Sequence, residues 1–148
     1  MKVHKKRGAT MPYLTEYDES SKLLIRVWWG VVTGEEILDA HDQLLQHLKN
    51  GLQIHYVIAD YSDVSSLDMS SDLVRLLADK DHLISQHESS ICAAIIATNT
   101  SVYGMIRMWQ TYAEKTGWMI NVFNNRTDAE IWLNEQRNEL KPHQAGKP

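Results

Sequence analysis

The strongest constraint on the fold is an alternation of short apolar runs with segments that have helical periodicity. Three runs, at 55–59, 90–98 and 118–123, have the length of strands and few charges, which is typical of strands buried on both faces. Between them, apolar residues recur at helical spacing. Strands that alternate with amphipathic helices favour right-handed crossovers and therefore a mostly parallel sheet.

Capping signals mark where the helices begin and end. Thr33 and Glu36 form a capping box, Thr127 and Glu130 form a second one, and Asn99 stands before a third helix. A further helix is expected from position 72. The gaps between these signals match ordinary helix lengths.

A hairpin precedes this alternating region. Residues 13–17 and 23–32 read as strands joined by a small acidic turn at 18–21, and Gly30 predicts a bulge in the second strand. We therefore predict an α/β domain of order β-β-α-β-α-β-α-β-α. Its sheet is mixed and mostly parallel, with five strands and an antiparallel first strand at an edge.

Charge and length divide the 148 residues into a domain at 12–138, a disordered basic tail at 1–11 and a C-terminal tail at 139–148. The first ten residues carry four basic and no acidic side chains, so the rest of the chain is acidic and nucleic acid is not an expected partner. No apolar run approaches the ~20 residues of a membrane helix, and no apolar stretch follows the basic N-terminus. We expect neither membrane insertion nor a secretory signal. The single cysteine, Cys92, suits a reducing cytoplasm.

Three stretches of the chain are similar to a known family. They are Gly30-Val31-Val32-Thr33-Gly34-Glu35-Glu36, the run Ala93-Ala94-Ile95-Ile96, and 122–133 with its Val-Phe, short polar turn, Ala and Trp-Leu. In order and spacing they resemble the SpoIIAA-like family of small bacterial proteins, which has a STAS-type fold. The resemblance implies a non-catalytic domain, a homodimer, and a fold related to CRAL-TRIO lipid-transfer domains.

The resemblance also bears on phosphorylation. In anti-sigma-factor antagonists, a serine after the second core strand is phosphorylated. Asp60, Ser62, Val64 and Asp68 fit that pattern here, but the phosphorylated position is Met69. Ser70, one place along, is the only nearby substitute, and a phosphate there would sit at a helix N-terminus. The alternative is that Ser70 caps the helix.

Ligands of open parallel sheets bind outside the carboxyl ends of the strands. This rule selects three loops, at 60–71, 98–101 and 124–127. Asp60 is either a carboxylate available to a ligand or a residue that caps loop amides. The candidate crevice consists of Asp60, Ser62, Asp68, Asn99 and Arg126.

No other pattern predicts chemistry. The seven histidines show neither metal-ligand nor triad spacing, and no Gly-rich phosphate loop occurs. His41 lies on an apolar helix stripe, which favours a hydrogen-bonded core imidazole, and Cys92 lies inside a strand, which favours an inert thiol. We predict no catalytic residue, metal or cofactor.

The tryptophans indicate a second candidate site. Trp109, Trp118 and Met105 gather around the third helix, where they form either a Trp-rich core or an apolar pocket or dimer surface. Arg107 could attract an anionic head group there. Three functions follow: a cytoplasmic binding or regulatory module with a protein partner, a carrier of a small apolar or lipid-like molecule, and a partner switch phosphorylated at Ser70.

Overall fold

The structure, a computed structural model, describes the backbone of residues 2–6 and 12–145 and the side chains of residues 12–138. Its elements follow one another along the chain as β1 (Lys2–Lys6), β2 (Tyr13–Asp18), β3 (Leu23–Thr33), α1 (Gly34–Lys49), β4 (Tyr56–Asp68), α2 (Ser71–Ser85), β5 (Cys92–Ile96), α3 (Thr100–Tyr112), the short 3-10 helix η1 (Ala113–Thr116), β6 (Met119–Phe123) and α4 (Arg126–Ala145). None of the helices within this described part is long and apolar enough to cross a membrane.

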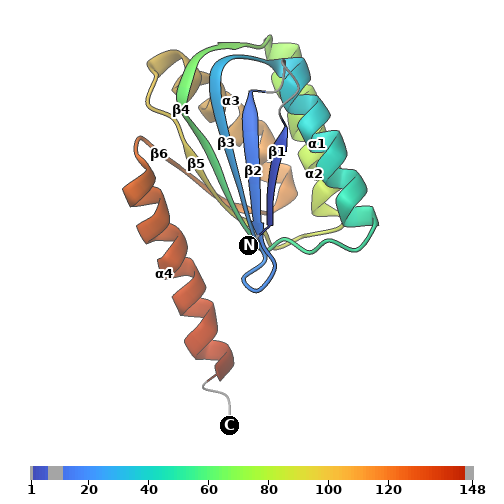
Figure 1. The fold of residues 1–148 in the computed structure, drawn as a ribbon, viewed down its shortest axis with the longest axis vertical. Coiled ribbons are helices and arrows are strands. Elements are labelled where there is room, and N and C mark those ends of the chain that lie inside the picture. Colours follow the sequence, from blue (N-terminus) through green and yellow to red (C-terminus); the bar gives the residue numbers. More distant parts are fainter. Residues whose placement is uncertain (1, 7–11, 146–148) are drawn as a thin grey trace.

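The strands form one mixed sheet whose spatial order, β1-β2-β3-β4-β5-β6, is also their order in the chain (Figure 1). β1, β2 and β3 pair antiparallel, and β3 to β6 pair parallel. All three parallel crossovers step the same way along the sheet. Because parallel crossovers are nearly always right-handed, α1, α2 and α3 lie on the same face of the sheet, and α4 packs on part of the other face. The predicted α/β fold with a mixed, mostly parallel sheet is confirmed.

The two ends of the chain differ from the prediction. Lys2–Lys6, expected to be disordered, forms a sixth strand that pairs with β2 from Lys2↔Tyr17 to Lys6↔Tyr13. Strand pairing uses backbone groups, so a polar segment beside an open edge can join a sheet without an apolar pattern of its own. The rest of the predicted tail lies outside the described residues. At the other end, α4 continues to Ala145, past the expected end near position 138.

β4 is the largest departure from the sequence-based expectation. A strand was predicted only to position 59, followed by a polar loop, but β4 continues through this loop to Asp68. Its second half pairs with the end of β3, from Trp29↔Asp63 to Thr33↔Asp68. The serines and aspartates in this half of β4 do not predict a strand by themselves. They form one because the long apolar strand β3 lies beside them and offers its backbone groups for pairing.

Most of the predicted helix caps and the predicted strand bulge are present. The capping box of Thr33 and Glu36 opens α1, and Gly30 has φ 71° beside a register shift between β3 and β4. The second predicted box is wrong, because the amide of Asp128 donates to Asn125 Oδ1 instead. The capping residue therefore precedes Thr127 by two positions.

One burial prediction is also wrong. β6 was expected to be buried on both faces, but as an edge strand it leaves Met119 54% exposed. Two further large apolar side chains are exposed, Leu76 of α2 and Trp29 of β3. Trp28, on the opposite face of β3, is buried.

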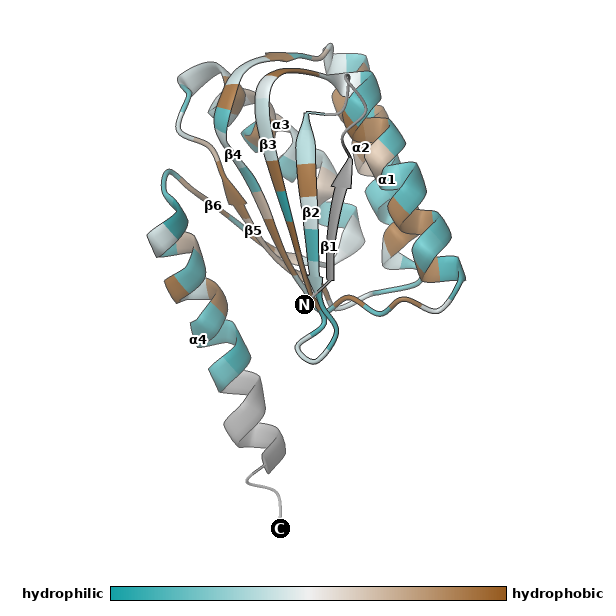
Figure 2. Cartoon of the chain, viewed as in Figure 1, coloured by the Kyte–Doolittle hydropathy of each residue, from teal (hydrophilic) through white to brown (hydrophobic). Residues whose placement is uncertain are grey.

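Two apolar cores lie on the two faces of the sheet. The larger is formed by α1, α2 and α3 with inward residues of β2 to β5. The smaller is formed by Ala129 and Leu133 of α4 with Ile58, Ala94 and Ile96. β5 contributes to both cores and is hydrophobic along its length (Figure 2).

Candidate ligand cavity

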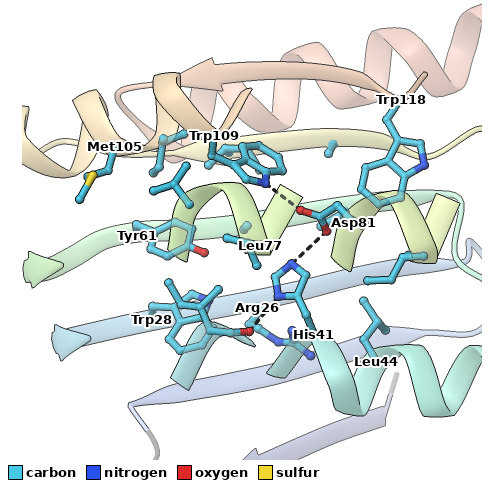
Figure 3. A pocket seen from close by; sticks show the side chains of 18 of the residues that line it. Arg26, Trp28, His41, Leu44, Tyr61, Leu77, Asp81, Met105, Trp109 and Trp118 are labelled. Atoms are coloured by element: carbon cyan, nitrogen blue, oxygen red, sulfur yellow. Dashed lines mark hydrogen bonds and ion pairs between the residues drawn. The ribbon is translucent and has the colours of Figure 1, made fainter. Parts of the chain in front are cut away.

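A cavity lies between the sheet and its three-helix layer. The centre of a water molecule can occupy about 100 Å³ of it. For comparison, an engineered apolar cavity of about 150 Å³ binds benzene. Side chains from β3, β4, β5, α1, α2 and α3 form its walls, together with Trp118 (Figure 3). This space is smaller than that cavity, so a one-ring ligand fits only if flexible wall side chains such as Met105 shift.

Small residues on the sheet leave this space open. Ala59 of β4 and Ala93 of β5 form part of its floor, and register places Ala59 beside Arg26 of β3. Large aromatic walls stand around this floor, including Trp28, which stacks on Tyr61 with ring centroids 5.9 Å apart. An alanine floor beneath rigid aromatic walls cannot collapse easily, so the void persists.

A polar network joins the three helices over the cavity. Asp81 of α2 is only 2% exposed. Its Oδ2 accepts a 2.7 Å hydrogen bond from Trp109 Nε1 of α3, and its Oδ1 lies 3.1 Å from His41 Nε2 of α1. The carboxylate therefore links α1, α2 and α3 at one point.

His41 faces an oxygen with each ring nitrogen. Its Nδ1 lies 2.9 Å from the carbonyl oxygen of Ile37, and its Nε2 faces Asp81. A carbonyl and a carboxylate can only accept, so both contacts are hydrogen bonds when both nitrogens carry a hydrogen. Both ring nitrogens therefore have an acceptor beside them, which agrees with the predicted hydrogen-bonded imidazole.

Arg26 places a second charge on the cavity wall. β3 alternates its side chains, so Arg26 points to the same face as the buried Leu24 and Trp28. Its Nε donates to Thr15 Oγ1 at 3.2 Å, and its guanidinium lies 5.2 Å from the centroid of the Tyr13 ring. Burial lowers the pKa of Arg26, while the nearby phenols of Tyr13 and Tyr61 act in the opposite direction.

Tyr61 adds a hydroxyl to the same cavity. Burial raises the pKa of this phenol well above its usual value; Arg26 lowers it and Asp81 raises it. The hydroxyl therefore keeps its hydrogen at neutral pH and can donate a hydrogen bond. Arg26, His41, Tyr61 and Asp81 are the polar residues of an otherwise mainly apolar lining.

Comparison with known proteins gives the fold a name. No protein-family model matches this chain, and no curated protein sequence matches it. Among solved structures, it is similar to an uncharacterized protein of the DUF3478 family with a SpoIIAA-like fold, from Shewanella loihica PV-4. The two share 20% sequence identity with a TM-score of 0.52, over 82% of this chain and 91% of that one. The chain has a SpoIIAA-like fold.

In this SpoIIAA-like fold, the predicted phosphorylation region lies at the start of α2. Met69, at the position where the resemblance places a phosphorylated serine, is buried and lines the cavity. Ser70 is the N-cap of α2, and its Oγ accepts from the amide of Leu73 at 3.2 Å. The hydroxyl of Ser70 thus already has the capping role that was the alternative to a phosphosite.

The structure brings together three of the five candidate crevice residues. Asp60 Oδ1 accepts from the amide and the hydroxyl of Ser62, at 2.9 and 2.6 Å. Asp60 Oδ2 accepts from Arg126 Nη1 at 3.2 Å, and Arg126 Nε also contacts Glu130. Both oxygens of Asp60 are therefore used within the protein, which gives this cluster a structural role between β4 and α4.

The other two crevice residues lie elsewhere. Asn99 caps α3 and donates from Nδ2 to the Ser65 carbonyl of the overhanging part of β4, while Asp68 ends β4 beside Thr33. A shallow groove does lie past the ends of β5 and β6, but none of its lining residues is charged: Ala97, Thr98, Thr100, Tyr103, Val122, Phe123 and Asn124. Within the described side chains, no group of three or more His, Cys, Asp or Glu could hold a metal ion.

The second predicted site overlaps the cavity only in part. Met105, Trp109 and Trp118 line it, whereas Arg107 is exposed on the outer side of α3 and borders a separate surface hollow. The sequence-based reasoning overlooked Arg26 and Asp81. Both carried a usable signal, since each is a charged residue at an inward position, Arg26 between Leu24 and Trp28 of a strand and Asp81 between Leu77 and Ile84 of a helix.

Proposed function

We propose that this chain is a non-catalytic binding module that holds a small, mainly apolar molecule in the cavity beneath α1, α2 and α3. The observation that supports the proposal is the cavity itself, because native cores seldom contain voids of this size. Its lining combines large apolar walls with a few polar groups, which is the usual composition of a ligand site. The SpoIIAA-like fold agrees with a binding or regulatory module.

The interactions of the polar groups favour binding over catalysis. Asp81 accepts a contact on each of its oxygens, from Trp109 and His41, so its carboxylate is held within a structural network. Asp60 is engaged in the same way at the opposite face. Homodimerisation and phosphorylation at Ser70 stay predictions from the sequence.

The test is a titration with toluene, a neutral apolar probe of one ring. Binding to the folded state raises the free energy of unfolding by about 1.4 kcal/mol at ten times Kd. We expect a rise in Tm with toluene concentration and a change in tryptophan fluorescence, because Trp109 and Trp118 line the cavity.

The control variant is Ala93→Leu, which extends a floor residue into the cavity. This variant should show no toluene-dependent rise in Tm. If the wild-type protein does not respond up to the solubility limit of toluene, the proposed function is wrong.

A further inference from the structure

The position of Arg26 is unusual for a charged side chain. It lies in the middle of β3, between two strands, on the sheet face that forms the larger core. Its neighbours along that face are the buried Leu24 and Trp28. A guanidinium at such a place loses much of its hydration, and a protein normally compensates this loss with a carboxylate.

No such carboxylate accompanies Arg26 among the described side chains. Residues 1–11, which include the strand next to β2, contain no Asp or Glu. Asp81, the acidic residue of the cavity, is bonded to His41 and Trp109. The positive charge of Arg26 is therefore not balanced by an ion pair within this part of the protein.

The donors of Arg26 leave one edge of its guanidinium available. The Nε hydrogen is directed to Thr15, and none of the described residues accepts a hydrogen bond from the two Nη atoms. This Nη edge presents two parallel N–H groups, which is the geometry that binds both oxygens of a carboxylate. Tyr61 lines the same cavity, and its hydroxyl has no hydrogen-bond partner among the described residues.

We propose that the ligand of this cavity carries a carboxylate, which binds to the Nη edge of Arg26 and the hydroxyl of Tyr61, and an apolar body of about one ring. The apolar body packs against the walls formed by Leu77, Met105 and Trp109. This inference rests on the proposed function and specifies the ligand class. A cationic ligand fits less well, because Arg26 already places a positive charge on the cavity wall.

The experiment compares three probes of similar shape: benzoate, its neutral isostere benzamide, and toluene. Wild-type protein should bind benzoate at least about tenfold more tightly than benzamide, since a carboxylate adds charge-assisted hydrogen bonds. Arg26→Met should weaken benzoate binding by at least about tenfold and leave the Kd of toluene within about threefold.

Arg75→Gln is the matched control. Like Arg26, Arg75 lies 5.2 Å from a tyrosine ring centroid and donates from Nε to a hydroxyl, but it lies on the exposed side of α2 and does not line the cavity. This variant should bind all three probes as the wild type does. Tyr61→Phe, which removes only the hydroxyl, should weaken benzoate binding and retain toluene.

The possible outcomes separate the two proposals. Toluene binding without a preference for benzoate over benzamide would overturn the carboxylate inference and leave the proposed function intact. Equal benzoate binding by Arg26→Met and wild type would do the same. If none of the probes binds to the wild type, both proposals fail. If Arg26→Met does not fold, two other measurements test the carboxylate inference. They are the ratio of the benzoate and benzamide affinities of the wild type, and the benzoate affinity of Tyr61→Phe.

Discussion

At the residue scale, the cavity depends on charged side chains at inward positions of apolar elements. Arg26 interrupts the inward face of β3, and Asp81 interrupts the apolar stripe of α2. Burying a charge is costly unless partners satisfy it. The partners of Asp81 are His41 of α1 and Trp109 of α3, so one carboxylate links the three helices that cover the cavity.

The first prediction concerns this network. Asp81→Ala should lower the free energy of unfolding by about 2–4 kcal/mol, because it leaves buried donors of His41 and Trp109 without an acceptor. Asp79→Ala, on the same helix, is the control. Asp79 pairs with Lys115 at the surface, so its loss should cost less than about 1 kcal/mol. Urea unfolding would measure both, and equal losses would contradict the role of the network.

The second prediction concerns pH and the single thiol. Burial raises the pKa of Cys92 to about 11. Because only the thiolate reacts, roughly 0.1% of the thiol is in the reactive form at pH 8. Iodoacetamide should therefore modify the folded protein slowly at pH 8 and faster as the pH rises toward 11. Protein unfolded in urea is the control, and it should react at the rate of an ordinary cysteine; a folded protein that reacted as fast would refute the prediction.

At the element scale, local signals decided where most helices begin and end. Thr33, Ser70 and Asn99 each accept a backbone amide at a helix N-terminus. Gly117 ends η1 in the left-handed region, with φ 76°. These signals act through neighbouring residues alone, so they can be read from the sequence.

The third prediction compares two glycines near α3. Gly104 lies inside the helix, and a Cβ there would meet no atom within 4 Å. Gly104→Ala should therefore stabilise the protein by about 0.5–1 kcal/mol through its higher helix propensity. Gly117→Ala should destabilise it by about 1 kcal/mol, because alanine disfavours positive φ. Thermal unfolding of the two variants should show Tm shifts of opposite sign, and shifts of the same sign would count against this interpretation.

At the scale of the whole molecule, the two faces of the sheet are packed differently. Three crossover helices cover one face and leave a cavity, while α4 alone covers part of the other. β5 separates the two, because its successive side chains point to opposite faces. Ala93 faces the cavity, and Ala94 faces the core beneath α4.

The fourth prediction uses this pair of neighbouring alanines. Ala93→Leu should stabilise the protein by about 0.5–2 kcal/mol, because the new side chain fills empty space. Ala94→Leu should destabilise it by about 1–3 kcal/mol, because Ala94 is fully buried in the core beneath α4 and a larger side chain overpacks that core. Calorimetry of both variants measures the difference. Equal destabilisation would show that the cavity cannot accept a side chain.

The sequence by itself determined the order of the elements from β2 onward, the parallel core of the sheet and most helix ends. It did so because capping and periodicity depend on residues within a few positions of one another. It also indicated Met105, Trp109 and Trp118 as neighbours around one helix.

The tertiary structure decided which residues far apart in the sequence contact one another. Asp60–Asp68 became a strand because β3 offered a partner, and Lys2–Lys6 joined the sheet because β2 offered an open edge. The meeting of His41, Asp81 and Trp109 required three helices to converge over one point of the sheet. Such contacts join positions far apart in the chain, and no local pattern encodes their distance.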